Sequence, residues 1–186
     1  MKRFGNWVLE VWAAQAWVEI PRAAGQYRTM KSLAPTARMG RWFDDYASHH
    51  QTAGNKRTHQ VGIPLILLGL LGLFARCGVY VLGSSGVVQL DGGIGLWGLA
   101  GLWYLILDWK LALPFGLFSL GLYFLGRVIP VPVLFGFFIL GWALQFLGHS
   151  CFEKKSPAFY SNLRHLLIGP IWIFAQWVDY TREDLH

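Results

Sequence analysis

The central part of this sequence is almost without charge. Charged residues between His59 and His149 are limited to Arg76, Asp91, Asp108, Lys110 and Arg127. Across all 186 residues, 54% are hydrophobic and only 14% are charged. Because water-soluble domains expose more charge than this, the composition argues against a soluble fold and predicts a membrane protein. Ten tryptophans suit the membrane interface, where an indole ring contacts both acyl chains and headgroups.

Cysteine is also scarce, and the basic residues are unevenly placed. Cys77 and Cys151 are too few for a disulfide framework, and neither has a partner at metal-site spacing. Residues 1–38 contribute +4 of the net charge of +6, which leaves +2 for the rest of the chain. Since no basic patch with interleaved aromatics continues through the body, the sequence argues against nucleic-acid binding. Basic residues that flank apolar spans indicate topology and contact with anionic lipid instead.

The N-terminal segment has a different composition from the rest. Glu10 and Glu19 interrupt its apolar stretch and no small-residue cleavage site follows, so it is a poor signal peptide. We predict an N-terminal extension over residues 1–38, amphipathic or disordered, with a surface helix at 6–20 ended by Pro21. A membrane-embedded domain is predicted over residues 39–180, followed by a tail at 181–186.

The apolar block divides at turn signals into four predicted helices. These membrane helices are expected at residues 61–82, 94–107, 111–126 and 133–147. The fold class is therefore all-α, a polytopic membrane bundle of about four transmembrane helices. The two short middle spans could instead form a hairpin that enters the bilayer only partly. Either arrangement returns the chain to its starting side, and the last apolar run, 166–178, is expected at the interface or packed against the bundle.

Loop charges predict the orientation of this bundle. The loop at residues 83–93 has no lysine or arginine. Basic residues of the opposite side are Arg41, Lys56, Arg57, Lys110, Lys154, Lys155 and Arg164. The positive-inside rule then places the histidine side, where the chain both enters and leaves the bundle, in the cytoplasm. The expected location is the bacterial inner membrane, or the endoplasmic reticulum of a eukaryote.

An even number of crossings brings three histidines to one membrane face. His50 and His59 precede the block and His149 follows it, which predicts a metal site at the membrane surface. His50 and His59 are nine residues apart, and this spacing would put them on opposite sides of a straight helix. The two histidines can therefore meet only if the helix breaks between them. We expect the break at Gly54, with Asn55 as the N-cap of the new helix.

Helical spacing places Glu153 on the same face as His149, four residues away. Three imidazoles and a carboxylate approach the ligand set of a non-haem Fe(II) site, and zinc suits the same ligands. The other histidines, His49, His165 and His186, are interpreted as ordinary interfacial residues.

Two motifs carry a resemblance to a known family. They are Tyr46-x3-His50-x4-Asn55-x3-His59-x2-Gly62-Ile-Pro64 and Gln145-Phe-Leu-Gly-His149-x2-Phe-Glu153-Lys-x2-Pro157-Ala158. In this order the chain resembles, from about Trp42 to Val178, the small multi-pass family that includes the fungal 2-hydroxy-fatty-acid dioxygenase of phytosphingosine breakdown.

The resemblance implies Fe(II)-dependent α-oxidation, in which a 2-hydroxy fatty acid and O2 give a fatty acid one carbon shorter. The family's histidines carry over onto His50, His59 and His149 as ligands of Fe2+. Glu153 is expected as a fourth ligand or as a hydrogen-bond partner that fixes an imidazole, and Asn55 and Gln145 are expected to support the ligands.

The resemblance also suggests where the substrate lies. Lys56 or Arg57 would pair with the substrate carboxylate or, as an equal alternative, contact lipid headgroups, and the acyl tail would lie between the spans. The chain departs from the family at Gln176, where relatives tend to have an acidic residue in the last apolar run.

Two other classes of function compete with the dioxygenase. A zinc-dependent membrane lipid hydrolase would use the same histidines to generate hydroxide. A non-catalytic lipid-binding or transport-associated protein is disfavoured, because few ionisable residues lie deep within the spans. A di-iron fatty-acid hydroxylase needs about eight histidines in His-rich boxes, and the six present here do not supply them.

Overall fold

The computed structural model describes residues 35–83, 86–160 and 162–180. Its helices are α2 (Ala37–Ser48), α3 (Ala53–Phe74), α4 (Gly92–Val128), α5 (Val131–Leu147), a π-helical turn η1 (Gly148–Glu153), a 3-10 turn η2 (Ala158–Tyr160) and α6 (His165–Trp177). Strands β1 (Gly78–Gly83) and β2 (Gly86–Asp91) form an antiparallel hairpin. The predicted surface helix at 6–20 and the tail at 181–186 lie outside the described residues.

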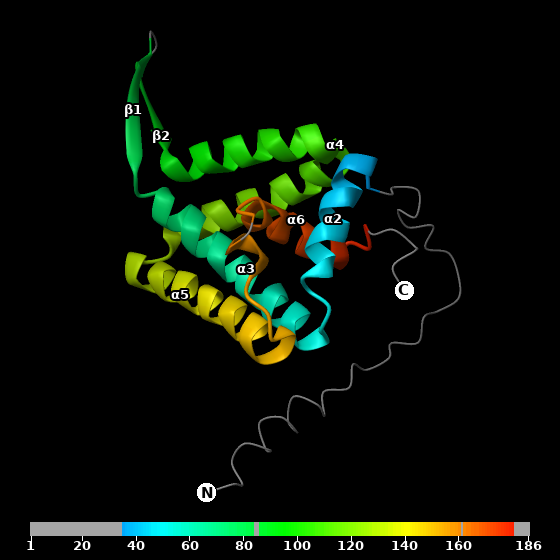
Figure 1. Ribbon diagram of the computed structural model, residues 1–186. Helices are drawn as coiled ribbons and strands as arrows, with labels where there is room; N and C mark the ends of the chain where they lie inside the picture. Colours follow the sequence, from blue (N-terminus) through cyan, green and yellow to red (C-terminus); the bar gives the residue numbers. More distant parts are fainter. Residues whose placement is uncertain (1–34, 84–85, 161, 181–186) are drawn as a thin grey trace, which may run out of the picture.

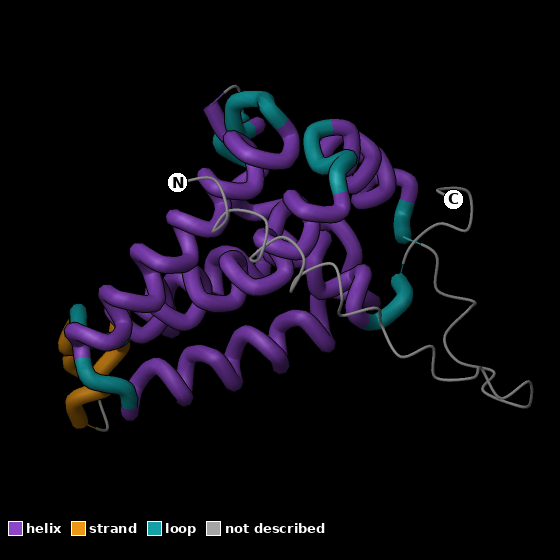
Figure 2. The backbone as a smooth tube through the Cα atoms, turned by 90° about the horizontal axis from the view of Figure 1, so that it is seen from below, coloured by secondary structure: helices purple, strands orange, loops and turns teal. Residues whose placement is uncertain are grey.

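The long helices lie side by side, and the β-hairpin projects from one end of the bundle (Figures 1 and 2). Three segments are long and apolar enough to cross a membrane: α3, α4, and α5 together with η1. This arrangement confirms the predicted all-α membrane bundle. We call the end that carries the β-strands the hairpin end, and the opposite end, which carries His50, His59 and His149, the histidine end.

Helix α4 is bent back on itself at Asp108, where the backbone is non-helical (φ −160°, ψ 95°). Contacts between its two halves run antiparallel: Trp97 Nε1 donates to the carbonyl of Gly116 at 3.1 Å, and the rings of Tyr104 and Phe115 lie 5.3 Å apart. The Asp108 carboxylate caps the second half by accepting from the Leu111 amide. The two halves correspond to the predicted spans 94–107 and 111–126, so the chain passes along the bundle four times.

The predicted first span lies too late in the sequence. The apolar pattern predicts a helix over residues 61–82, but α3 begins at Ala53 and ends at Phe74, and residues 78–83 form β1. Thr52 explains the early start, because its side chain accepts a hydrogen bond from the Asn55 amide and caps the helix. The predicted helix extended to residue 82 because a short apolar run such as 78–82 does not distinguish a strand from a helix.

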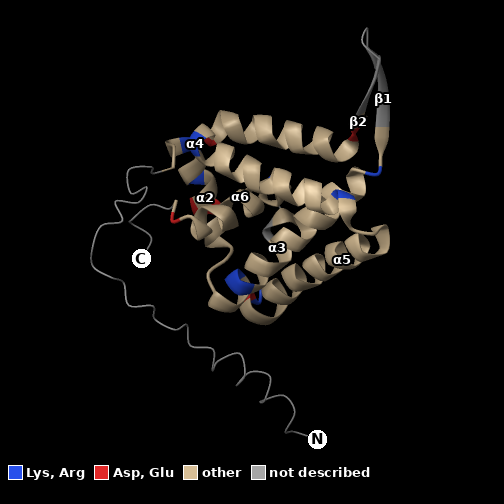
Figure 3. Ribbon diagram, turned by 180° about the vertical axis from the view of Figure 1, so that it is seen from behind, with Lys and Arg blue, Asp and Glu red and all other residues tan. Residues whose placement is uncertain are grey.

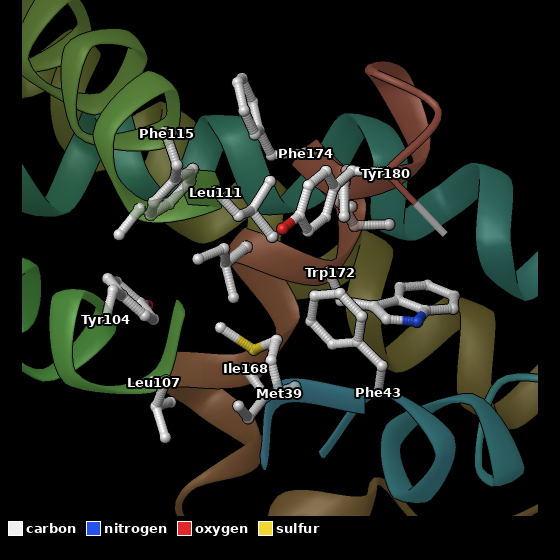
Figure 4. Close-up of a cluster of buried hydrophobic side chains, with 14 of the residues drawn as sticks. Met39, Phe43, Tyr104, Leu107, Leu111, Phe115, Ile168, Trp172, Phe174 and Tyr180 are labelled. Carbon is white, nitrogen blue, oxygen red and sulfur yellow. The ribbon is translucent and has the colours of Figure 1, made fainter. Parts of the chain in front are cut away.

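A compact core joins α2 and α6 to both halves of α4. Figure 4 shows Met39 and Phe43 of α2 facing Ile168 and Trp172 of α6. Met39 and Ile168 are fully buried, and most residues of α6 are buried. The last apolar run therefore packs against the bundle, which is one of the two positions expected for it.

Glycines bring α3 and α5 into close contact near the histidine end. A side chain on Gly62 would lie 2.8 Å from the Gly141 carbonyl oxygen, and one on Gly141 would lie 2.7 Å from that of Gly62. Such spacing is shorter than real Cβ contacts allow, so the crossing requires glycine in both helices. Because His59 lies one turn from Gly62 on α3, and His149 two turns from Gly141 beyond the end of α5, this crossing draws the two histidines together.

Candidate metal centre

His50 and His59 meet because the chain breaks between α2 and α3. Helix α2 ends at Ser48 and α3 begins at Ala53, so His50 lies in the connecting turn. The predicted break is present, but it comes before Gly54, and Thr52 is the N-cap in place of Asn55. Asn55 lies in the first turn of α3, where it is fully buried.

Backbone carbonyls fix the orientation of both imidazoles. Nδ1 of His50 lies 2.7 Å from the Tyr46 carbonyl oxygen, and Nδ1 of His59 lies 2.9 Å from that of Asn55. A carbonyl oxygen only accepts hydrogen bonds, so each Nδ1 donates, and in a neutral ring Nε2 then carries the lone pair. Burial lowers the pKa of His50 to about 4, which keeps this ring neutral at physiological pH.

The two Nε2 atoms face each other at a separation that suits a metal ion. They lie 3.2 Å apart. Two lone pairs at this distance repel each other, whereas a cation between them would be coordinated by both. Two imidazole nitrogens bound to one metal at about 2.1 Å, with an angle of about 90–110°, lie about 3.0–3.4 Å apart. The observed distance falls within that range.

His149 completes the group from the end of α5. It lies in the π-helical turn η1, where we expected an ordinary α-helix. Its ring centroid lies 4.9 Å from that of His50 and 5.0 Å from that of His59. Nδ1 of His149 is buried and has no hydrogen-bond partner. One nitrogen from each of the three rings lies within 4.8 Å of the others, so this buried group could bind a metal ion.

Glu153 holds the turn that carries His50. Its carboxylate accepts from the Gln51 amide at 3.1 Å, the Thr52 amide at 3.2 Å, the Thr52 hydroxyl at 2.9 Å and Asn55 Nδ2 at 3.1 Å. The three-histidine group does not include this carboxylate. These bonds go to the turn and to Asn55 and not to an imidazole, so Glu153 joins η1 to the start of α3 instead of fixing a histidine ring directly.

Asn55 and Gln145 both lie beside the histidines. The Asn55 side-chain amide donates to the Glu153 carboxylate, while the backbone carbonyl oxygen of Asn55 accepts from His59. Gln145 is one turn before His149, is 5% exposed, and its Nε2 has no partner. Gly148 allows the close approach of α3, since any Cβ there would clash with the side chains of Asn55 and Thr58.

Sequence reasoning missed Tyr46 and His165 as parts of this site. The Tyr46 ring stacks on His50 with centroids 4.0 Å apart, and its edge meets His165. His165 was interpreted as interfacial, but it is 4% exposed and its Nε2 lies 2.8 Å from Asp45 Oδ2. The Tyr46-x3-His50 spacing could have indicated the stacking, since residues four apart share a helix face. No local signal links His165 to Asp45, which is 120 residues away.

An apolar cavity of about 360 Å³ begins at the three histidines. Its walls come from α3, both halves of α4, α5 and α6, and its polar residues include Gln145, His165 and Ser119. Neither Lys56 nor Arg57 lines it, so the cavity walls do not support the expected pairing of these residues with a carboxylate. Gln176 also lies outside the lining, three turns along α6 from His165.

The charged side chains gather at the two ends of the bundle (Figure 3). At the hairpin end, Arg76 donates to the carbonyl of Ile129 at 2.8 Å, and Arg127 donates to the Tyr123 hydroxyl at 3.2 Å. The cavity itself is lined mainly by apolar side chains.

Comparisons with known proteins indicate the family of this chain. The family described as "2-hydroxy-palmitic acid dioxygenase Mpo1-like" matches residues 36–180. Saccharomyces cerevisiae has a 2-hydroxy-palmitic acid dioxygenase, MPO1, that is 41% identical to this chain over 44 residues. That stretch covers 23% of this chain and 25% of the yeast protein, so the match spans a quarter of the relative's length. No solved structure matches the chain.

Proposed function

This chain belongs to the Mpo1-like family, and from that membership we propose that it is an Fe(II)-dependent dioxygenase that shortens 2-hydroxy fatty acids by one carbon. The observation that carries the proposal is the approach of two Nε2 atoms to 3.2 Å beside a third buried histidine. Histidine-rich sites with open coordination positions are typical of non-haem iron oxygenases. The relative's name supplies the substrate class, and the apolar cavity next to the histidines suits an acyl chain.

The overall reaction balances with O2 as the only oxidant. A 2-hydroxy acid, RCH(OH)COOH, and O2 give RCOOH, CO2 and H2O. The bond between C1 and C2 breaks, C2 is oxidised to the new carboxyl group, and C1 leaves as CO2. O2 accepts the four electrons. When bound, Fe(II) would supply the activation of O2 that this oxidation requires.

The protein's own residues would hold the metal and orient the substrate. His50, His59 and His149 would be the ligands, with Tyr46 and Asn55 fixing the proton of the first two on Nδ1 through their carbonyl groups. Glu153 would keep the turn at His50 in place through the bonds that it accepts from Gln51, Thr52 and Asn55, as either a positioning residue or a further ligand.

The location that we propose is the cytoplasmic face of a membrane. Most of the basic side chains lie at the histidine end, while Arg76 and Arg127 at the hairpin end contact backbone carbonyls and a tyrosine hydroxyl. A substrate from the bilayer would reach the histidines without passing through water.

Metal content and O2 consumption of the detergent-purified protein test this proposal. With Fe(II) and 2-hydroxypalmitate, we expect O2 uptake and a C15 fatty acid, and we expect His149→Ala to abolish both. His49→Ala is the matched control, because this neighbouring histidine is outside the three-histidine group. Stoichiometric zinc with lipid hydrolysis and no O2 uptake would replace the proposal with the hydrolase. A protein that binds no metal would favour the non-catalytic alternative.

A further inference from the structure

The cavity would have to receive the polar head of a substrate without a lysine or arginine in its wall. Neither residue type is among the described residues that line it. A carboxylate that leaves water needs hydrogen-bond donors or a metal ion, because a buried charge without partners is strongly destabilising. Apart from a metal ion, its partners must therefore be hydroxyl, amide, indole or imidazole groups of the lining.

Several of these groups already have partners. Trp97 and Ser119 donate to backbone carbonyl oxygens of their own helix, α4. The Tyr104 hydroxyl donates to the Leu167 carbonyl at 2.5 Å. These hydrogen bonds join the walls of the cavity to one another, so the three side chains have a structural use that does not involve a ligand.

Tyr46 differs from Tyr104 in this respect. Its side chain is 4% exposed and lines the cavity, but within the described part of the chain its hydroxyl makes no hydrogen bond. A phenol is protonated at neutral pH and has one proton to donate. Because a buried hydroxyl normally has a partner, a free donor in the wall of an apolar cavity suits a ligand that accepts a hydrogen bond.

Contacts with α6 and with the histidines fix where this hydroxyl lies. The Tyr46 ring stacks on His50 with centroids 4.0 Å apart and planes at 10°, so the hydroxyl lies close to the imidazole. A Cβ added to Gly169 would be 2.8 Å from the hydroxyl oxygen and 3.2 Å from Ile63 Cδ1. Gly169 and Ile63 also line the cavity, and Ile63 is one turn from His59 on α3. The hydroxyl is therefore part of the cavity wall next to the three histidines.

We propose that the Tyr46 hydroxyl binds the carboxylate of the fatty acid, as a hydrogen-bond donor beside the metal ligands. The inference rests on the proposed function, because it takes the polar head of a fatty acid to lie at the histidines. A hydrogen bond to a charged group raises affinity by about 10–100-fold, which is more than a bond to a neutral oxygen contributes. The hydroxyl therefore selects a carboxylate over an uncharged head on the same acyl chain.

The two cavity tyrosines provide a matched pair of variants. Tyr46→Phe removes the free hydroxyl and keeps the stacked ring, whereas Tyr104→Phe removes a hydroxyl that is already bonded. Both side chains are buried, and each variant loses one oxygen atom. We expect Tyr104→Phe to lower the melting temperature, because the Leu167 carbonyl loses this donor, and Tyr46→Phe to leave it unchanged.

Binding of hexadecanoic acid and of 1-hexadecanol to the detergent-purified, metal-free protein isolates the effect of the carboxylate. We expect Tyr46→Phe to lower the ratio of acid affinity to alcohol affinity about tenfold, and Tyr104→Phe to leave it unchanged. Fe(II) affinity should be the same in both variants, since the Tyr46 carbonyl that accepts from His50 is retained. With Fe(II) and 2-hydroxypalmitate, Tyr46→Phe should raise KM and keep kcat.

Gly169→Ala in the Tyr46→Phe protein controls for the space that the hydroxyl leaves. The added methyl group would lie against the position of the hydroxyl oxygen, so the double variant fills that volume without restoring a donor. We expect it to bind the acid as weakly as Tyr46→Phe does. Restored acid affinity would show that packing holds the substrate, and would overturn the proposal.

The remaining outcomes separate this carboxylate site from the dioxygenase. An acid-to-alcohol ratio that Tyr46→Phe leaves unchanged would overturn the carboxylate site, and so would a loss of Fe(II) affinity in this variant. A lowered ratio, without O2 uptake by the wild type, would support the carboxylate site and contradict the dioxygenase. O2 uptake with the same KM in the wild type and Tyr46→Phe would contradict the carboxylate site and leave the dioxygenase standing.

Discussion

Both ends of this bundle bury polar side chains, but they differ in whether those side chains are satisfied. At the hairpin end, Asp91 accepts from the Tyr123 hydroxyl at 2.7 Å and from the Ile94 amide at 2.9 Å, with Arg127 4.0 Å away. At the histidine end, the buried atoms without a partner are Asn55 Oδ1, Gln145 Nε2, His149 Nδ1 and His165 Nδ1. Among the residues that the structure describes, all four such atoms lie at the histidine end.

The difference separates a structural polar cluster from a functional one. A buried polar atom without a hydrogen-bond partner costs about 1–3 kcal/mol, so folded proteins have few of them. The Asp91 cluster carries no such cost, and Asp91 caps the N-terminus of α4. The metal ion and the substrate proposed above would supply partners for such atoms beside the cavity.

The largest expected effect comes from His59→Ala. Loss of one of three ligands should lower metal affinity more than about 100-fold, because even residues that only support a ligand contribute 10–100-fold. Fe(II) should raise the melting temperature of the wild type, since a ligand at 100 times its Kd stabilises the folded state by about 2.7 kcal/mol. We expect no such rise in His59→Ala. An equal rise in both proteins would place the metal elsewhere.

A smaller effect is expected for Glu153→Gln. The amide group would place a donor opposite the amides of Gln51 and Thr52, which the carboxylate now accepts from. The turn at His50 should loosen, with a loss of about 1–3 kcal/mol in the free energy of unfolding and about 10–100-fold in metal affinity.

Lys154→Gln is the control for Glu153→Gln, because this neighbouring side chain is exposed. Calorimetric titration with Fe(II) measures the metal affinity of the two variants. Unchanged affinity in Glu153→Gln would remove this residue from the site.

The sequence predicted the parts of the molecule that depend on local pattern. Apolar runs predicted the helices, and the even number of passes predicted that His50, His59 and His149 meet. The bend at Asp108 follows from a polar residue between two apolar runs. The predicted start of α3 was wrong, because the Thr52 cap outweighs the polar character of residues 53–60.

Other features depend on contacts between distant residues and could not be predicted from local pattern. The Asp45–His165 contact joins α2 to α6, and the hydrogen bonds of Glu153 join η1 to the turn before α3. Asp108 accepts from the Thr36 amide, 72 residues away. Such pairs become visible only when the helices are packed, because each partner alone has the sequence context of an ordinary surface residue.

At the hairpin end, Tyr123→Phe should affect stability and leave the metal site intact. It removes one hydrogen bond to Asp91 while the Ile94 amide remains, so we expect a loss of about 1–2 kcal/mol in the free energy of unfolding. Fe(II) should still raise the melting temperature as in the wild type. If Fe(II) no longer raised the melting temperature of Tyr123→Phe, the hairpin end would affect metal binding, and the distinction between a structural end and a functional end would be wrong.

The smallest effect, and the one that tests the contrast most directly, is expected for Gln145→Met. Methionine has a similar volume and no polar nitrogen, so the change removes the unsatisfied Nε2 without leaving a void. If the unsatisfied Nε2 destabilises the fold but contacts the substrate, the variant should be more stable by about 1 kcal/mol. It should also bind the polar head of the substrate several-fold more weakly. Denaturant unfolding of metal-free protein and the KM for 2-hydroxypalmitate measure the two effects separately. A variant that is less stable and equally active would show that Gln145 belongs with Asp91 and Tyr123, as a residue of the scaffold.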